Sequence, residues 1–172
     1  MKFLFILIIS LSIAHAAETP FSNKAYAFLN KHDYANAKQM LEKGIKNNEP
    51  VAFRTLGLMY INGDGVQKNY KLALDYFQQA FKHGYINAAY DIGVMYRNGE
   101  GITKNRQTAK KYYLVAAKNN YPLAQFELAK IYAQEGDIQN FKIWAEKALH
   151  NGYRPRTQSD SAIIDYFRSL QG

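Results

Sequence analysis

The stretch INGDGVQKN, residues 61–69, returns as RNGEGITKN at residues 97–105. Both copies keep two glycines, a lysine and an asparagine, each 36 residues on: Gly63/Gly99, Gly65/Gly101, Lys68/Lys104 and Asn69/Asn105. A glycine-rich stretch with a lysine can bind phosphate, and one with acidic residues can bind calcium. A stretch that recurs at a fixed interval indicates instead a repeat architecture built from stacked units.

The residues around the two stretches predict two helices in every repeat. Apolar side chains recur every four residues and therefore share one helical face. Before the loops these are Ala52, Leu56, Gly57 and Tyr60; Ala88, Ile92, Gly93 and Tyr96; and, in a third copy, Ala124, Leu128, Ala129 and Tyr132. After the loops they are Ala73, Tyr76, Phe77 and Ala80; Ala109, Tyr112, Tyr113 and Ala116; and Phe141, Trp144, Ala145 and Ala148.

The ends of the second helices carry matching signals. A good N-cap, whose side-chain oxygen accepts an unpaired backbone N–H, precedes each of them: Asp33, Asn69, Asn105 and Asp137. A residue that readily adopts the left-handed conformation follows each of them: Asn48, Gly84, Asn120 and Gly152. The same choice at both ends of four segments predicts four helix–turn–helix repeats.

The glycine stretch is therefore interpreted as the joint between the two helices of a repeat. Gly63 and Gly65 are expected to take positive φ, with Val66 or Ile102 turned inward. A phosphate-binding loop needs a preceding strand and the pattern G-x-x-x-x-G-K-[ST], and neither is present. A calcium loop needs several oxygen ligands, whereas each copy has a single acidic residue.

The pattern A-x-x-x-L-G-x-x-Y-x-x-G-x-G-V, followed by A-x-x-W-Y-x-x-A-x-x-x-G, resembles the SEL-one-like repeat (SLR), a relative of the tetratricopeptide repeat. Residues 52–84 and 88–120 match it nearly throughout. Residues 124–152 lack the glycine loop and look like a shortened tetratricopeptide-like repeat, and residues 21–48 form a degenerate first repeat. The resemblance implies an all-α fold, a right-handed α/α superhelix (solenoid) of about four repeats.

The last segment, residues 157–170, predicts a C-terminal capping helix that closes the solenoid. Ser159 or Asp160 is expected to be its N-cap. The apolar positions expected to cover the last repeat are Ile163, Phe167 and Leu170.

The face of each first helix opposite the predicted core is a candidate binding surface. A helix face turned to water should carry Glu, Lys and Gln, but this one carries mostly apolar and aromatic side chains. In three repeats its positions hold Arg54, Leu58 and Ile61; Tyr90, Val94 and Arg97; and Phe126, Lys130 and Ala133. Two interpretations remain open: half-buried filler packed across a tightly curved groove, or an amphipathic groove for an extended peptide or a helix. Aromatic anchors with arginine favour the second, and in the tetratricopeptide relatives these positions line the peptide groove.

The first residues predict export. Lys2, an apolar run over residues 3–13 and the exit Ala14-His15-Ala16 have the layout of a signal peptide, residues 1–16, cleaved before Ala17. The run is shorter than the roughly 20 residues of a spanning helix, so no stable membrane insertion is expected after cleavage. The expected location is the periplasm or the outside of the cell.

Charge and composition narrow the choice of partner. Without Lys2, 21 basic and 14 acidic residues leave a net charge of +7. Such a charge suits nucleic acid, anionic polymers or an acidic protein, but the export signal and the scattered lysines argue against nucleic acid. The chain has no cysteine, which excludes disulfides, thiolate nucleophiles and cysteine-bound metals.

No catalytic, cofactor or metal site is predicted. The S-x-x-K, S-D-N, K-T-G, G-x-S-x-G and H-E-x-x-H patterns are absent. His32, His83 and His150 are read as capping or surface residues, and Glu127 and Glu135 have no predicted acid–base task. The expected function is a non-enzymatic adaptor that binds a protein or peptide. The alternative is a binder of the envelope polymer peptidoglycan, or a β-lactamase-like hydrolase as in the cysteine-rich SLR branch.

Overall fold

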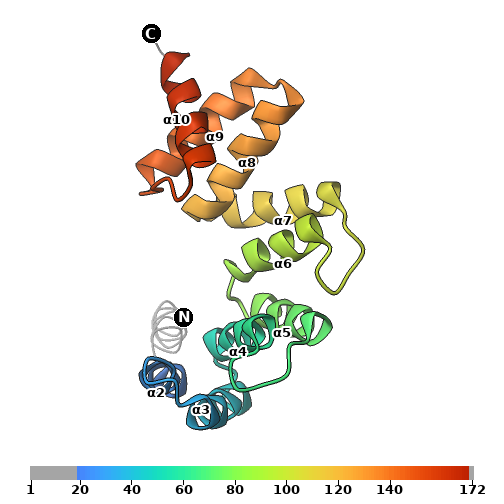
Figure 1. Cartoon of the computed structure of the whole chain (residues 1–172), viewed down its shortest axis with the longest axis vertical. Helices are drawn as coiled ribbons and strands as arrows, with labels where there is room; N and C mark the ends of the chain where they lie inside the picture. Colours follow the sequence, from blue (N-terminus) through green and yellow to red (C-terminus); the bar gives the residue numbers. More distant parts are fainter. Residues whose placement is uncertain (1–18, 171–172) are drawn as a thin grey trace, which may run out of the picture. The chain divides into compact units, whose positions relative to one another are not determined.

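The computed structural model describes residues 19–170, which form nine α-helices and no strand (Figure 1). Eight of these helices form four pairs: α2 (Pro20–Leu29) with α3 (Tyr34–Lys46), α4 (Pro50–Asn62) with α5 (Tyr70–Lys82), α6 (Ala88–Asn98) with α7 (Arg106–Lys118), and α8 (Pro122–Glu135) with α9 (Ile138–His150). A ninth helix, α10, spans Gln158–Ser169. The predicted signal peptide, residues 1–16, lies outside the described residues.

The chain divides into two compact units. Unit 1 ends at His83 and contains α2–α5, and unit 2 begins at Gly84 and contains α6–α10. Within unit 1, α3 packs against α4, and within unit 2, α7 packs against α8, so successive hairpins stack in both units. The all-α helical-repeat solenoid predicted from the sequence is confirmed.

The predicted apolar faces form the core of each unit. The alanine and leucine or isoleucine positions of the first helices are all at most 1% exposed: Ala52, Leu56, Ala88, Ile92, Ala124 and Leu128. The glycine that follows the isoleucine in α6 allows close packing, because a Cβ on Gly93 would stand 2.7 Å from the ring of Tyr113 on α7. Gly57 has the same relationship to Phe77 in unit 1.

The capping residues also lie where the sequence places them. Each predicted N-cap accepts a hydrogen bond from the backbone N–H three residues on, and these residues are Asp33, Asn69, Asn105 and Asp137. The four residues expected after the second helices have positive φ: Asn48 (57°), Gly84 (94°), Asn120 (60°) and Gly152 (89°). Local sequence therefore fixes the length of every second helix.

The glycine stretch of unit 1 is the joint between α4 and α5. Gly63 and Gly65 have φ of 82° and 67°, and a Cβ on Gly65 would collide with the side chain of Tyr34 on α3. Val66 packs against the core cluster of unit 1, as expected.

An ionisable side chain that the sequence did not single out links the first two hairpins of unit 1. Glu49, 5% exposed, immediately precedes α4. Its carboxylate accepts hydrogen bonds from the backbone N–H groups of Phe21 and Ser22, in the first turn of α2, and from the Ser22 hydroxyl. Glu49, at the start of the second hairpin, therefore caps α2, the first helix of the preceding hairpin.

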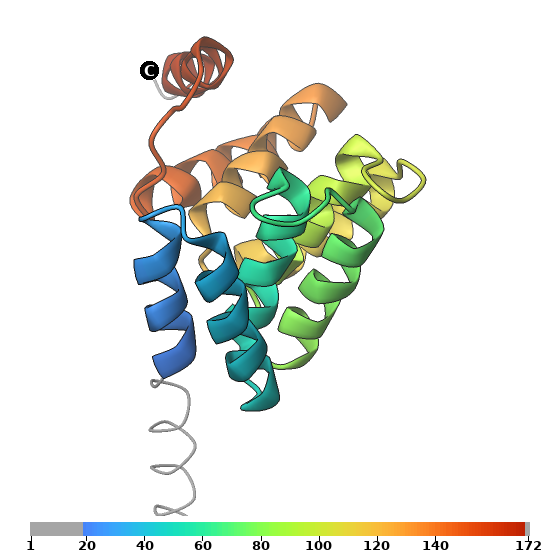
Figure 2. The same ribbon diagram turned by 60° about the horizontal axis from the view of Figure 1, so that its bottom comes forward.

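The capping helix exists, but its predicted N-cap is wrong. Figure 2 shows an extended segment between α9 and α10, and Thr157 caps α10 by accepting the N–H of Asp160 at 3.1 Å. Asp160 is buried and reaches back to accept the N–H of Arg156. Thr157 thus satisfies an N–H of the first turn of α10, and Asp160 satisfies the N–H of the residue before the N-cap, in a variant of the capping box. Ile164 and Phe167 of α10 are buried, and Ile163 of α10 and Leu170, the residue that follows the helix, are half-buried.

Candidate partner-binding surface

The predicted groove residues lie on the first helices of three repeats. In unit 1, α4 carries Arg54, Leu58 and Ile61; in unit 2, α6 carries Tyr90, Val94 and Arg97, and α8 carries Phe126 and Lys130. All of them except Phe126 are half-buried. Both units therefore present an apolar and basic surface that is partly accessible.

The prediction that Phe126 lines a binding surface is wrong. Phe126 is 1% exposed and stacks on Tyr153 with the ring centroids 4.0 Å apart. Ile164 of α10 belongs to the same cluster. The chain after α9 returns over this position, so Phe126 is part of the core of unit 2.

Tyr90 lies in a small aromatic cluster of unit 2. Its ring meets that of Tyr121 edge-on at 5.3 Å and that of Tyr113 at 5.7 Å. Burial is the main cause that raises the pKa of Tyr90 to about 12. The phenol is therefore neutral at physiological pH, and Tyr90 can offer a partner an aromatic surface with a hydroxyl.

The two predicted basic residues of unit 2 meet at one carboxylate. Arg97 Nη1 lies 2.7 Å from Oε2 of Glu127, and Lys130 Nζ lies 2.7 Å from Oε1 of the same residue. The side chain of Glu127 is only 12% exposed. None of the groove positions predicted from the sequence is acidic, and the pairing of Glu127 with two of them was not predicted, although the Glu-x-x-Lys spacing on α8 was a signal for the second pair.

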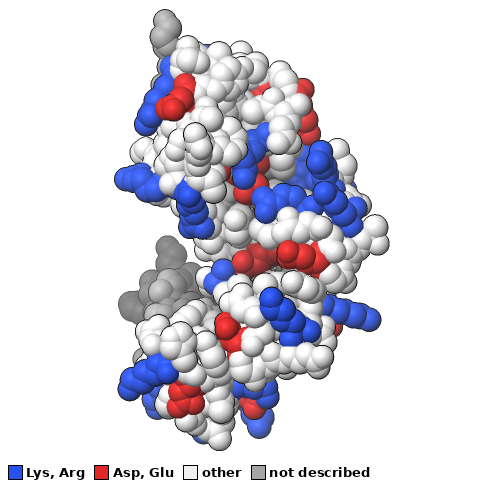
Figure 3. Space-filling view, viewed as in Figure 1, with Lys and Arg blue, Asp and Glu red and all other residues white. Residues whose placement is uncertain are grey.

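A cavity of about 540 Å³ adjoins these ion pairs in unit 2. Its charged lining consists of four basic and two acidic side chains: Arg97, Arg106, Lys110, Lys130, Glu127 and Glu135. Figure 3 shows Lys and Arg side chains gathered over α7 and α8. Positive charges thus outnumber negative ones, which favours an anionic ligand.

Most of the charged groups around this cavity already have a partner. Lys110 Nζ lies 2.5 Å from Oε2 of Glu135 and 4.1 Å from the centre of the Tyr132 ring. Arg106 is exposed and makes no ion pair with any residue in the range 19–170. It is therefore the basic group of the cavity that is most readily available to a ligand.

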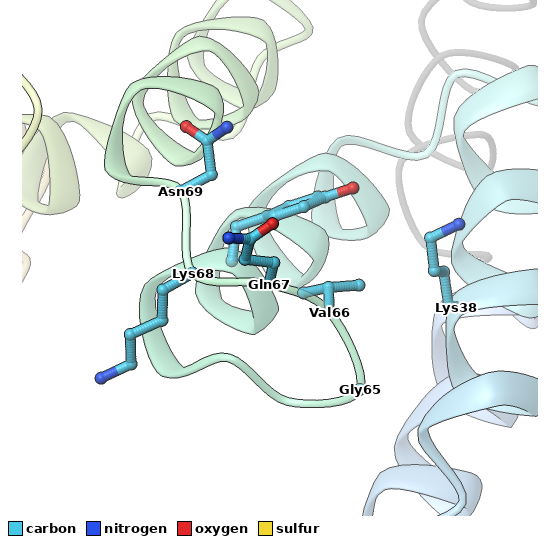
Figure 4. Close-up of a pocket in the computed structure, with 7 residues that line it drawn as sticks. Lys38, Gly65, Val66, Gln67, Lys68 and Asn69 are labelled. Carbon is cyan, nitrogen blue, oxygen red and sulfur yellow. The ribbon is translucent and has the colours of Figure 1, made fainter.

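Unit 1 has a second cavity, of about 580 Å³, beside the glycine loop. It is lined by Lys38 of α3, Tyr60 of α4 and residues 65–69 (Figure 4). Lys38 is paired with Glu42 at 2.7 Å, a hydrogen bond that is the main cause of its raised pKa. Figure 4 shows Lys68 extending away from Lys38 on the other side of the loop. The loop lysine therefore does not complete a phosphate cradle, in agreement with the joint interpretation.

The structure gives the surroundings of the three histidines that follow the predicted signal peptide. Within residues 19–170, no three His, Asp or Glu side chains are grouped so that they could hold a metal ion. His83 stacks on Phe53 at 4.8 Å, His32 hydrogen-bonds the Tyr34 hydroxyl at 2.9 Å, and His150 is the last residue of α9. Among these residues, moreover, no helix has the length and apolar character needed to cross a membrane.

Comparisons with known proteins identify the class of repeat. The family model for the Sel1 repeat matches residues 56–85 and 86–121. The chain is similar to a solved Sel1 repeat protein from Oxalobacter formigenes, with 25% sequence identity and a TM-score of 0.75 over 87% of this chain and 61% of that one. It also has the fold of c5321, a protective antigen present in uropathogenic Escherichia coli strains, with 22% identity and a TM-score of 0.76 over 93% of this chain and 35% of that one. No curated protein matches the sequence.

The chain is thus a helical-repeat protein that contains two Sel1 repeats, as its sequence motif indicated. It spans 61% and 35% of the lengths of the two solved relatives. The Sel1 repeat fold typically serves as a non-catalytic scaffold, and it suggests a module for protein interaction.

Proposed function

We propose that the chain is a non-enzymatic adaptor that binds a peptide or a helix of another protein on the exposed face of its first helices. The observation that carries the proposal is the surface of unit 2, where Tyr90, Val94, Arg97 and Lys130 are half-buried and accessible. Aromatic and arginine side chains with this partial exposure are typical of the energetic centres of protein interfaces. Unit 1 has a surface of the same kind, formed by Arg54, Leu58 and Ile61 of α4.

The place of action proposed is the bacterial periplasm or the outside of the cell. It rests on the signal peptide predicted for residues 1–16, so the partner would be an exported protein as well. Cleavage is tested by mass spectrometry of the protein purified from the periplasm: an N-terminus at Ala17 supports the proposal, and an intact N-terminus contradicts it.

Peptide binding is tested with an immobilised library of dodecapeptides. The double variant Arg97→Gln/Lys130→Gln removes two charges from the proposed surface and retains hydrogen-bonding side chains for Glu127. Lys111→Gln/Lys118→Gln removes the same charge from exposed positions of α7 and is the matched control. We expect the wild type to select a consistent set of peptides, and the groove variant, but not the control, to lose them.

The competing function is binding of an anionic envelope polymer, which the net charge of +7 that remains without Lys2 favours. Its signature is different, because binding through diffuse charge depends on the number of cations and falls steeply with salt. If both double variants bind isolated peptidoglycan sacculi equally weakly, if salt abolishes that binding, and if no peptide is selected, the adaptor proposal is wrong.

A further inference from the structure

One hydroxyl group of unit 2 is buried without a partner. Tyr113 of α7 is 0% exposed, and its Oη atom is the only buried side-chain polar atom in residues 19–170 that makes no hydrogen bond. Buried hydroxyl groups in folded proteins almost always have a partner, because an unsatisfied one carries the full cost of its desolvation. The exception therefore calls for a physical reason.

The side chain that carries this hydroxyl borders a cavity, which supplies one. Tyr113 lines the 540 Å³ cavity of unit 2, together with Arg97 and Glu127. Burial, above all, raises the pKa of the Tyr113 phenol well above its usual range. The phenol is therefore protonated under all physiological conditions, and its unpaired donor belongs to a side chain of the cavity wall.

The charges around the cavity define the sign of that group. Glu127 is paired with Arg97 and Lys130, and Glu135 is paired with Lys110. Four basic side chains against two acidic ones leave an excess of two positive charges. The only basic lining residue without an ion pair among the described residues is Arg106. A phenol donor and unbalanced cations at one cavity favour an anion.

The geometry also indicates which anion fits. Arg97 and Lys130 each place a nitrogen 2.7 Å from an oxygen of Glu127, so one carboxylate is already held between two cations at this cavity. Ile131 of α8 and Ile163 of α10 add apolar walls, which suit the methylene groups of an acidic side chain. A peptide segment with Asp or Glu combines both requirements.

We propose that the unit 2 cavity binds a carboxylate of an acidic peptide segment, with the Tyr113 hydroxyl, Arg106 and Lys110 as hydrogen-bond donors. The proposal rests on the proposed function, since its ligand is a peptide. It adds side chains of α7 and α10 to a cavity that also borders Arg97 and Lys130 of the proposed surface, and it specifies the charge of the partner segment.

The test uses fluorescence anisotropy with a labelled hexaglutamate peptide and the full chain. Tyr113→Phe removes only the hydroxyl, and Arg106→Gln/Lys110→Gln removes two cations of the cavity. Lys43→Gln/Lys46→Gln, at exposed positions of α3 in unit 1, removes the same charge elsewhere. Loss of a hydrogen bond to a charged group should raise the Kd about tenfold in the first two variants. The Kd of the control should rise less than about twofold, because exposed charges are screened.

Three results would overturn the inference. Equal weakening in the control and in Arg106→Gln/Lys110→Gln would show that only the overall charge attracts hexaglutamate. An unchanged Kd in Tyr113→Phe would exclude the phenol as a donor. Competition by inorganic phosphate that is stronger than competition by acetate, and that disappears in Tyr113→Phe, would assign the site to phosphate instead of a carboxylate.

The outcome is separable from that of the proposed function. In one outcome, peptides selected from the library no longer bind Arg97→Gln/Lys130→Gln but bind Tyr113→Phe normally. This result would support the adaptor function and reject the carboxylate site. Hexaglutamate that binds through Tyr113, with no peptide selected from the library, would support the site and reject the adaptor function.

Discussion

Glu49 accepts two hydrogen bonds from Ser22, one from its backbone N–H at 2.9 Å and one from its hydroxyl at 2.6 Å. Both residues are almost fully buried, at 5% and 0% exposed. The relationship joins α2 to the residue that opens the next hairpin, so it is a contact between repeats. Glu49 also contacts Gly44 on α3, where a Cβ would stand 3.0 Å from its Oε2.

Replacing Glu49 by Ala should therefore destabilise unit 1. The change leaves the N–H groups of Phe21 and Ser22 and a buried hydroxyl without their acceptor. We expect the free energy of unfolding to fall by about 2–4 kcal/mol, since hydrogen bonds to a charged group and unsatisfied buried donors are both costly. Urea unfolding followed by circular dichroism measures it. The control Glu42→Ala removes an exposed ion pair with Lys38 and should lower the free energy of unfolding by less than about 1 kcal/mol. Similar losses of stability in both variants would contradict the role of Glu49.

Two buried tyrosines of unit 2 should respond in opposite ways to loss of the hydroxyl. Tyr113→Phe removes an unpartnered group and should leave the free energy of unfolding unchanged or raise it by up to about 1 kcal/mol. Tyr153→Phe removes a hydroxyl that hydrogen-bonds Asp160 and should lower it by about 1 kcal/mol. Chemical denaturation of both variants in one buffer makes the comparison. A loss of stability in Tyr113→Phe as large as that in Tyr153→Phe would mean that the Tyr113 hydroxyl has a partner in solution.

Gly93→Ala should destabilise unit 2 although Ala is the better helix former. The added Cβ would stand 2.7 Å from two carbons of the Tyr113 ring and 3.3 Å from the Ala109 carbonyl, so α6 and α7 must move apart. Overpacking of this kind costs about 1–3 kcal/mol, more than the gain of about 1 kcal/mol in helix propensity. Thermal unfolding of Gly93→Ala, alone and combined with Tyr113→Leu, tests the contact. The smaller leucine side chain should restore part of the lost stability. If it restores none, the contact between residues 93 and 113 is not the cause of the destabilisation.

The parts of the fold that the sequence predicts are those set by local chemistry. The Asp or Asn before each second helix and the Gly or Asn after it act within a few residues, and all eight behave as expected. The four-residue spacing of Ala and Leu or Ile likewise identifies the buried face, because every helix pair has to bury one. Helix α10 is the exception, since Thr157 and Asp160 satisfy its terminus together where a single N-cap was expected.

The site was less predictable because its residues depend on contacts between distant segments. Phe126 occupies a surface position in the repeat pattern, but Tyr153 and Ile164 follow the last repeat and cover it. The pairing of Arg97 with Glu127 joins two successive first helices, α6 and α8. Within one repeat, no pattern signals either contact. The predicted groove therefore keeps Tyr90, Val94, Arg97 and Lys130 in unit 2 and loses Phe126.

The end of unit 2 should respond to acid through Asp160. This carboxylate is 8% exposed. Burial tends to raise its pKa, but the hydrogen bonds from the Arg156 N–H and the Tyr153 hydroxyl, with the charge of Lys130, outweigh burial and hold the pKa of Asp160 below its ordinary value. A folded-state pKa below the unfolded value of about 3.9 means that the folded protein binds fewer protons. The ionised group therefore contributes stability above about pH 4, which is lost as the pH falls through the folded pKa.

The variant Asp160→Asn isolates this contribution because its amide does not titrate in that range. The difference in free energy of unfolding between wild type and Asp160→Asn should be constant from about pH 5 to 7 and shrink below about pH 4. Urea unfolding at several pH values measures the difference. Hydrogen bonds with Asn140 lower the pKa of Asp137, but the titration of Asp137 cancels in the difference because it occurs in both proteins. Asp165→Asn, on the exposed side of α10, should change stability by less than about 1 kcal/mol. A difference for Asp160→Asn that stays the same down to pH 3 would show that the buried carboxylate is not held in its ionised form by these donors.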